Sequence, residues 1–162
     1  VYQHGRGIGG DHLRLSERVV APVIRDLVVD WEKAYERVHR AKPYVISPKQ
    51  LPPGVTEHII SPQEIARYED ATRCINCFCC ATACISSHKS FIGPNAAMAS
   101  IVRMMDTRET AKDERLDLLY SEEGVYRCHT SKAYTHVCPK KIDVAHFIAL
   151  AKEGDSSGER DR

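Results

Sequence analysis

The stretch CINCFCCATAC, residues 74–84, decides how this chain of 162 residues folds. If one extra cysteine is set aside, its cysteines follow the spacing C-x2-C-x2-C-x3-C. Each two-residue gap lets the backbone turn, so that Cys74, Cys77 and Cys80 can present their thiolates to one cubane cluster. A distant Cys-Pro closes such a cluster, and Cys138-Pro139 supplies that element. The spacing therefore predicts a [4Fe-4S] cluster held by these four cysteines.

Other uses of the cysteines fit the pattern less well. Zinc motifs usually pair two C-x2-C knuckles, whereas here three evenly spaced cysteines precede a fourth. A disulfide framework would spread an even number of cysteines along a small secreted chain, but five of the seven fall within residues 74–84. The extra cysteine, Cys79, is outside the ligand spacing, and we expect it to be a small buried apolar residue.

The composition argues against several classes of protein. The chain has 23 Lys plus Arg against 22 Asp plus Glu, so it lacks the basic excess of a nucleic-acid-binding domain. No apolar run approaches the roughly 20 residues that a membrane-spanning helix needs. The sequence also lacks the apolar stretch and cleavage site of a secretory signal, so nothing argues for export.

The pattern of apolar residues predicts a mainly α protein, because no segment alternates with period two over any length. We expect helices at about 31–42, from Ser61-Pro62 towards Cys74, from Gly93-Pro94 to Met104, at 113–120, and after Cys138-Pro139. The predicted organisation is an irregular, glycine-containing N-terminal extension (1–18), a helical iron–sulfur domain (19–154) and a polar tail (155–162).

The sequence resembles the C-terminal, helical ferredoxin-like domain of the iron–sulfur subunit of succinate dehydrogenase and fumarate reductase (respiratory complex II). The resemblance covers about residues 19–152 and is carried by VIRDLVVDWEKAYERVHRAKPYV at 23–45, CINCFCCATAC at 74–84, FIGP at 91–94, DTR at 106–108 and RCH…CPKKID at 127–143. It implies the same [4Fe-4S] ligands that the spacing predicts. It also implies that Cys84 and Cys128 match two of the three ligands of a [3Fe-4S] cluster.

The chain departs from that family at the second cluster. Tyr134 stands where the third cysteine is expected, and Ile85 replaces the usual proline after Cys84. A phenolate can bind iron, but we expect Tyr134 to be an aromatic packing residue and an orthodox [3Fe-4S] cluster to be absent. The tryptophans that the family associates with quinone binding are missing between Cys84 and Gly93.

Some charged residues near the cysteines have open roles. The resemblance places His129 near a quinone, and a donor to a cluster sulfur or a backbone carbonyl is the alternative. Lys140 and Lys141 could offset the negative charge of a cluster or simply be solvated. His136 and His146 are expected at the surface.

The function that the resemblance implies is electron transfer without bond chemistry, from a flavoprotein subunit towards membrane quinone. The implied partners are that flavoprotein, a separate [2Fe-2S] domain or chain, and membrane anchor subunits, with a possible quinone and no nucleic acid. The expected location is peripheral, on the inner face of an energy-transducing membrane. One alternative is an iron–sulfur subunit of a heterodisulfide reductase-like or glycerol-3-phosphate/glycolate-type oxidoreductase. Another is a structural subunit that has lost part of its redox function.

Overall fold

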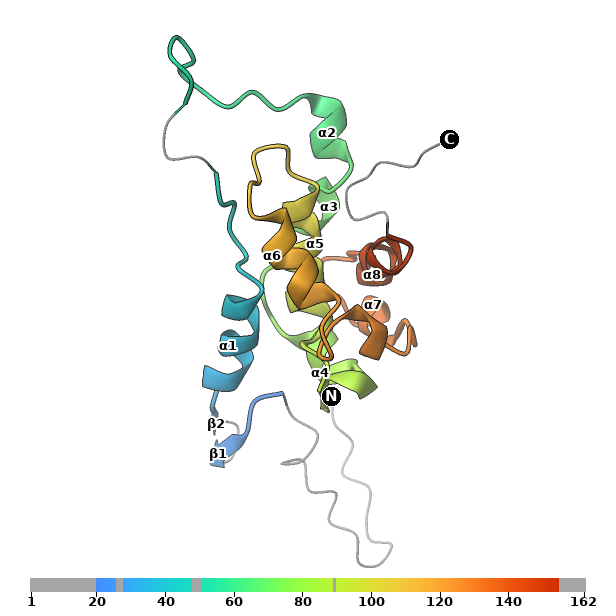
Figure 1. The fold of residues 1–162 in the computed structure, drawn as a ribbon. Helices are drawn as coiled ribbons and strands as arrows, with labels where there is room; N and C mark the ends of the chain where they lie inside the picture. Colours follow the sequence, from blue (N-terminus) through green and yellow to red (C-terminus); the bar gives the residue numbers. More distant parts are fainter. Residues whose placement is uncertain (1–19, 26–27, 48–50, 89, 155–162) are drawn as a thin grey trace, which may run out of the picture.

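The computed structural model of the protein describes residues 20–25, 28–47, 51–88 and 90–154 (Figure 1). The predicted N-terminal extension and polar tail lie outside the described residues. In chain order the elements are β1 (Val23–Arg25), β2 (Val28–Val29), α1 (Glu32–Arg40), α2 (Pro62–Ala66), α3 (Glu69–Thr72), α4 (Cys79–Ala83), η2 (Ile85–His88), α5 (Pro94–Met104), α6 (Lys112–Leu119), η3 (Val125–Arg127), α7 (Ala133–His136) and α8 (Val144–Lys152). The prediction of a mainly α fold is confirmed.

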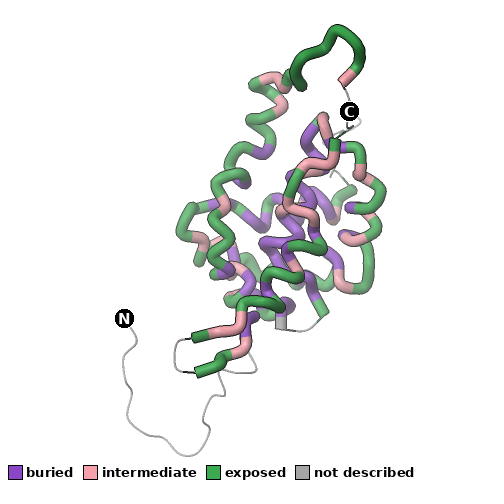
Figure 2. Tube along the Cα trace, turned by 90° about the vertical axis from the view of Figure 1, so that its left-hand side faces the viewer, coloured by how far each residue is buried: buried purple, intermediate pink, exposed green. Residues whose placement is uncertain are grey.

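Helix α5 is the centre of the fold. It is buried on nearly every side, and α1, α3, α4, α6 and α8 all contact it (Figure 1). A helix that is apolar all round belongs in a core rather than on a surface. Small residues such as Ala96, Ala97 and Ser100, each fully buried, let the neighbouring helices approach closely. Figure 2 shows the buried residues gathered in this central part, while the loop before α2 is exposed.

The helix starts that the sequence predicts are largely present. Ser61 caps α2, because its Oγ accepts from the Glu64 N–H at 3.2 Å while the Glu64 carboxylate accepts from the Ser61 N–H at 2.8 Å. The one helix predicted from here to the cysteines is instead divided into α2 and α3. The break falls at Tyr68, whose φ of −137° is not helical and whose side chain is buried.

The region before α2 holds the only two strands among the described residues. β1 and β2 form a short antiparallel hairpin that is too small to give a period-two signal. Helix α1 follows and buries Ala34 and Val38 against the core. The rings of Trp31 and Tyr35 lie 5.4 and 5.2 Å from the ring of Phe78, which ties this region to the cysteine loop.

A buried arginine fixes the chain after α1 to helix α6. Arg115 donates to the carbonyl oxygens of Ala41 at 3.0 Å and Tyr44 at 2.7 Å, and to the Glu109 carboxylate at 2.6 Å. Both members of this ion pair are buried, so each needs the other's charge and these backbone bonds. Within the described residues, no helix is long and apolar enough to cross a bilayer.

Candidate metal centre

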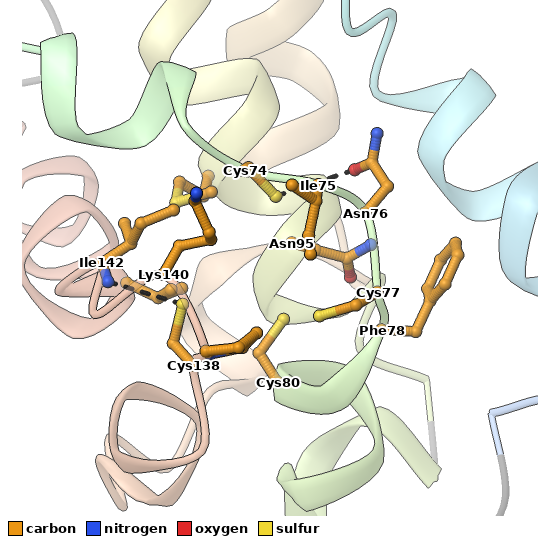
Figure 3. A pocket seen from close by; sticks show the side chains of 13 residues that line it. Cys74, Ile75, Asn76, Cys77, Phe78, Cys80, Asn95, Cys138, Lys140 and Ile142 are labelled. Carbon is orange, nitrogen blue, oxygen red and sulfur yellow. Dashed lines mark hydrogen bonds between the residues drawn. The ribbon is translucent and has the colours of Figure 1, made fainter.

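Four of the seven cysteines line one pocket. Cys74 follows α3, Cys77 lies in the next loop, Cys80 is in the first turn of α4, and Cys138 follows α7. Figure 3 shows their side chains directed into this shared space from different parts of the chain. The structure therefore brings together the four residues that the spacing selected.

Left-handed backbone turns aim these cysteines. Asn76 and Phe78 have φ values of 50° and 57°, so the chain curls between Cys74 and Cys80 instead of continuing a helix. After Cys138, Lys141 has a φ of 56° and its N–H donates to the Cys138 carbonyl at 3.0 Å. The turns in these two segments bring their thiols to the same pocket.

The other walls of the pocket are mostly apolar. They include Ile75, Phe78, Met98, Pro139, Ile142 and Val144. The Ile142 N–H donates to Cys138 Sγ at 3.4 Å, and Cys74 Sγ lies 3.8 Å from Asn76 Oδ1. Apolar walls with a few donors suit a sulfur-rich group, because they limit water and stabilise negative charge on sulfur.

Burial changes the acidity of two of these thiols. It raises the pKa of Cys80 to about 12, and it raises the pKa of Cys74, to which the neighbouring Cys77 and Cys138 also contribute. Since the thiolate is the metal ligand, these two groups have to lose protons when metal binds. Such a site needs the positive charge of metal ions to hold its thiolates.

The alternative that the cysteine spacing leaves open is a site for a single zinc ion. Among the residues that the structure describes, no group of three or more His, Cys, Asp or Glu side chains could hold one. Zinc would draw its thiolates to about 2.3 Å from one centre, so the sulfurs would be packed together. The four thiols border one pocket with mostly apolar walls.

Cys79 differs from the expectation. It is exposed, so the prediction of a buried apolar residue is wrong. Position 79 begins α4, and the side chains that α4 buries follow at Ala81. A hydrogen bond with Cys77 is the largest cause that raises the pKa of the Cys79 thiol, followed by partial burial.

The second pair of cysteines lies in a closed environment. Cys84, at the end of α4, and Cys128, after η3, are both buried. Tyr134 on α7 is fully buried beside them, and its hydroxyl is 3.2 Å from Cys128 Sγ. Burial is the largest cause that raises the pKa of Tyr134 far above its usual value, and the Cys128 bond adds to it. A neutral phenol bonded to a thiol thus stands at the position where the family resemblance implies a third cysteine.

The loop around Cys128 is also fixed by hydrogen bonds. The Thr130 N–H donates to Cys128 Sγ at 3.4 Å. The Lys152 ammonium donates to the Cys128 carbonyl at 2.7 Å and to Thr130 Oγ1 at 2.8 Å. The thiol is therefore held by a phenol and a backbone N–H.

Of the basic residues named from the sequence, one borders the pocket and the others are exposed. Lys140 borders it, while Lys141 is exposed. His129 is exposed, and its backbone N–H donates to Ser86 Oγ at 3.4 Å. His136 and His146 are exposed as predicted.

One residue of the pocket was not found from the sequence. Asn95, in the first turn of α5, borders the same space as the four cysteines and is only 4% exposed. Its amide nitrogen is buried without a hydrogen-bond partner. Only the packing of α5 against the cysteine loop brings it there, and no local sequence signal marks it.

Known iron–sulfur proteins are similar to the part of the chain that contains the pocket. A family model described as "4Fe-4S dicluster domain" matches residues 70–142. The succinate dehydrogenase iron–sulfur subunit of Coxiella burnetii is 35% identical over 143 residues, which are 83% of this chain and 60% of that protein. The fumarate reductase iron–sulfur subunit of Escherichia coli is 33% identical over 144 residues, covering 88% of this chain and 59% of that protein.

A plant protein and a chain of a solved structure are also similar to this chain. A mitochondrial succinate dehydrogenase [ubiquinone] iron–sulfur subunit of Oryza sativa is 34% identical over 135 residues, covering 81% of this chain and 48% of that protein. A chain in the solved structure of the Mycobacterium smegmatis Sdh1 complex in the apo form matches with a TM-score of 0.72 and 29% identity. That match covers 88% of this chain and 60% of the other. The chain thus spans about half to three-fifths of the length of these relatives.

Proposed function

The chain is a relative of the succinate dehydrogenase and fumarate reductase iron–sulfur subunits, and from this premise we propose that it transfers electrons within an oxidoreductase complex of that kind. The similarity includes residues 70–142, which match the family model described as "4Fe-4S dicluster domain". Electrons would pass from a flavoprotein subunit, through this chain, towards a membrane quinone. The names of the matched relatives favour this proposal over a heterodisulfide reductase-like or glycerol-3-phosphate/glycolate-type subunit.

The cofactor we propose is one [4Fe-4S] cluster held by Cys74, Cys77, Cys80 and Cys138. The observation that carries this proposal is the convergence of these four thiols on one pocket with mostly apolar walls. A bound cluster of this type supplies one-electron transfer, with a potential set by its surroundings. The chain's own residues hold the cluster, limit water around it and donate hydrogen bonds to its sulfurs.

The chain itself would carry out no bond chemistry. Its relatives are subunits of oxidoreductases, and we assign the oxidation of substrate to the flavoprotein partner. Thiols fully committed to a cluster are not free to act as nucleophiles or as general bases. We therefore assign no catalytic role to these four cysteines.

At the second position, we propose that no orthodox [3Fe-4S] cluster forms. Cys84 and Cys128 offer two thiols, and the third group, Tyr134, is neutral, buried and bonded to Cys128. Cluster ligands are normally thiolates, with histidine as an occasional replacement. This same observation favours a second candidate function, a structural subunit that keeps the fold and one cluster but has lost the next electron-transfer step.

The proposed partners follow from the relatives. They are a flavoprotein, a [2Fe-2S] centre from outside these 162 residues, and membrane anchor subunits. The chain would then be peripheral, on the inner face of the membrane, with His129 in the vicinity of the quinone. The exposed position of His129 supports that role and leaves it accessible to a partner.

Purification of the native assembly tests the proposal. We expect the chain to co-migrate in native electrophoresis with a flavoprotein, and succinate to reduce its cluster when the complex is intact. Recovery of the chain from its own cells as a free monomer would contradict the proposed assembly. Reduction that stops at the [4Fe-4S] centre, without reaching quinone, would favour the structural candidate.

A further inference from the structure

The amide of Asn95 is a buried donor without a partner. Its Nδ2 atom makes no hydrogen bond within the protein, although the residue is only 4% exposed. An unpaired buried polar group destabilises the folded state. A partner from outside the chain would remove that destabilisation, and the surroundings of Asn95 indicate which one.

Gly93 leaves space beside the Asn95 side chain. Gly93, with a φ of +107°, has no side chain, and a Cβ there would come within 3.3 Å of Asn95 Oδ1. The carboxamide oxygen therefore occupies space that a glycine leaves open. Figure 3 shows the Asn95 side chain extending from α5 among the labelled cysteines.

The pocket offers this amide the four cysteine sulfurs as acceptors, besides Asn76 Oδ1, which lies 3.8 Å from Cys74 Sγ. Asn95 borders the pocket together with the four thiols, and apolar neighbours such as Met98 and Val144 provide no strong acceptor. Sulfur that carries negative charge, as in a thiolate-bound cluster, accepts stronger hydrogen bonds than a neutral group. The position of Asn95 in the first turn of α5 adds the positive end of the helix dipole.

We propose that the Asn95 amide donates a hydrogen bond to a sulfur of the cluster held by Cys74, Cys77, Cys80 and Cys138, and so raises its reduction potential. This inference rests on the proposed cluster. A donor to sulfur stabilises the reduced cluster more than the oxidised one, because reduction adds negative charge. Asn95 thus stabilises the negative charge of the reduced cluster, but it is not one of the cluster's ligands.

A competing partner for the amide is water. Asn95 also borders a second cavity of about 180 Å³, together with Arg103, whose buried Nε likewise has no partner. Water in that cavity could accept from Nδ2, since polar cavities of this size hold water. In that case the amide would have no influence on the cluster.

The test is an EPR-monitored redox titration of the full chain carrying its cluster, with Asn95→Leu and Asn95→Asp as variants. Leu removes the donor at a similar size, and an ionised Asp removes it and also adds a negative charge that lowers the potential further. We expect unchanged iron and sulfide content and a lower midpoint potential. At a given applied potential, we expect the ratio of oxidised to reduced cluster to rise roughly tenfold. For a one-electron couple, this corresponds to a midpoint potential that is lower by about 59 mV.

A matched control lies on the same helix. Ser100 is fully buried and its Oγ also lacks a partner, but it does not border the pocket. Ser100→Ala should leave the potential unchanged. If both Asn95 variants keep the cluster at the wild-type potential, the amide bonds elsewhere and the inference is overturned. If the wild-type chain binds no iron, the proposed function fails as well, so the two failures are distinguishable.

Discussion

Two groups of cysteines lie in one small helical domain, and their surroundings differ. Cys74, Cys77, Cys80 and Cys138 surround a pocket with mostly apolar walls and a free buried donor. Cys84 and Cys128 are buried, and a tyrosine hydroxyl bonds directly to one of them. The first group borders a pocket that a metal group can fill, whereas a protein side chain fills the space beside the second. The second group has two thiols, and a phenol stands where the family resemblance implies a third.

The largest effect should come from breaking the open group. Cys77→Ser should abolish the [4Fe-4S] cluster, because serine removes one of four thiolates that the cube requires. Iron and acid-labile sulfide per chain, with EPR of the reduced protein, measure the loss. Cys79→Ser is the matched control two residues away, and it should retain the full cluster because Cys79 does not border the pocket. Equal losses in both variants would contradict the ligand assignment.

The next largest effect should come from opening the closed group. Tyr134→Cys supplies a third thiol beside Cys84 and Cys128 and removes the phenol. We expect up to three additional iron atoms per chain and an EPR signal in the oxidised protein, where a [3Fe-4S] centre is paramagnetic. Tyr134→Ala, which makes space without a thiol, is the control and should gain no iron. A signal of similar intensity in the wild-type chain would show that the second group already binds a cluster.

Much of this comparison could be predicted from the sequence, because cluster ligands are specified by short spacings. The Ser61 cap and the start of α5 at Gly93-Pro94 are local features, and the structure has them as predicted. The four cysteines line one pocket, although Cys138 is far from the other three in the sequence. The substitution at Tyr134 also suggested a defective second site. The sequence could not show that the phenol bonds to Cys128, since that contact depends on how α7 packs.

The failures have physical causes too. The β1–β2 hairpin is too short to produce a periodic pattern, and the break between α2 and α3 depends on burying Tyr68. The exposure of Cys79 follows from the direction in which α4 meets the core. The place of Asn95 in the pocket depends on the packing of α5, which contacts residues far away in the sequence.

A smaller effect should follow from removing only the bond between phenol and thiol. Tyr134→Phe keeps the ring and its burial but deletes the hydroxyl. We expect a loss of about 1 kcal/mol in the free energy of unfolding, the usual contribution of one buried hydrogen bond. Urea denaturation of the cluster-bound chain measures it, and iron content should remain at the wild-type value. Loss of iron in Tyr134→Phe would mean that the phenol supports the first cluster or binds metal itself.

The smallest effect concerns alkaline pH. Burial holds the pKa of Tyr134 far above the value of about 10 in an unfolded chain. The folded state therefore binds this proton more tightly, and its contribution to stability is fully present below pH 10. That contribution is lost as pH rises above 10, when the phenol ionises in the unfolded chain. Between pH 9 and 11, wild type should lose stability more steeply than Tyr134→Phe, and identical slopes would contradict the assigned shift.

The comparison as a whole is tested most directly by counting the metal in the purified full chain, reconstituted with iron and sulfide without oxygen. The structure predicts four iron and four sulfide atoms per chain, an EPR signal after reduction, and none in the oxidised state. Seven iron atoms with a near-stoichiometric oxidised-state signal that disappears in Cys128→Ser would contradict it. Stoichiometric zinc in place of iron would contradict it as well.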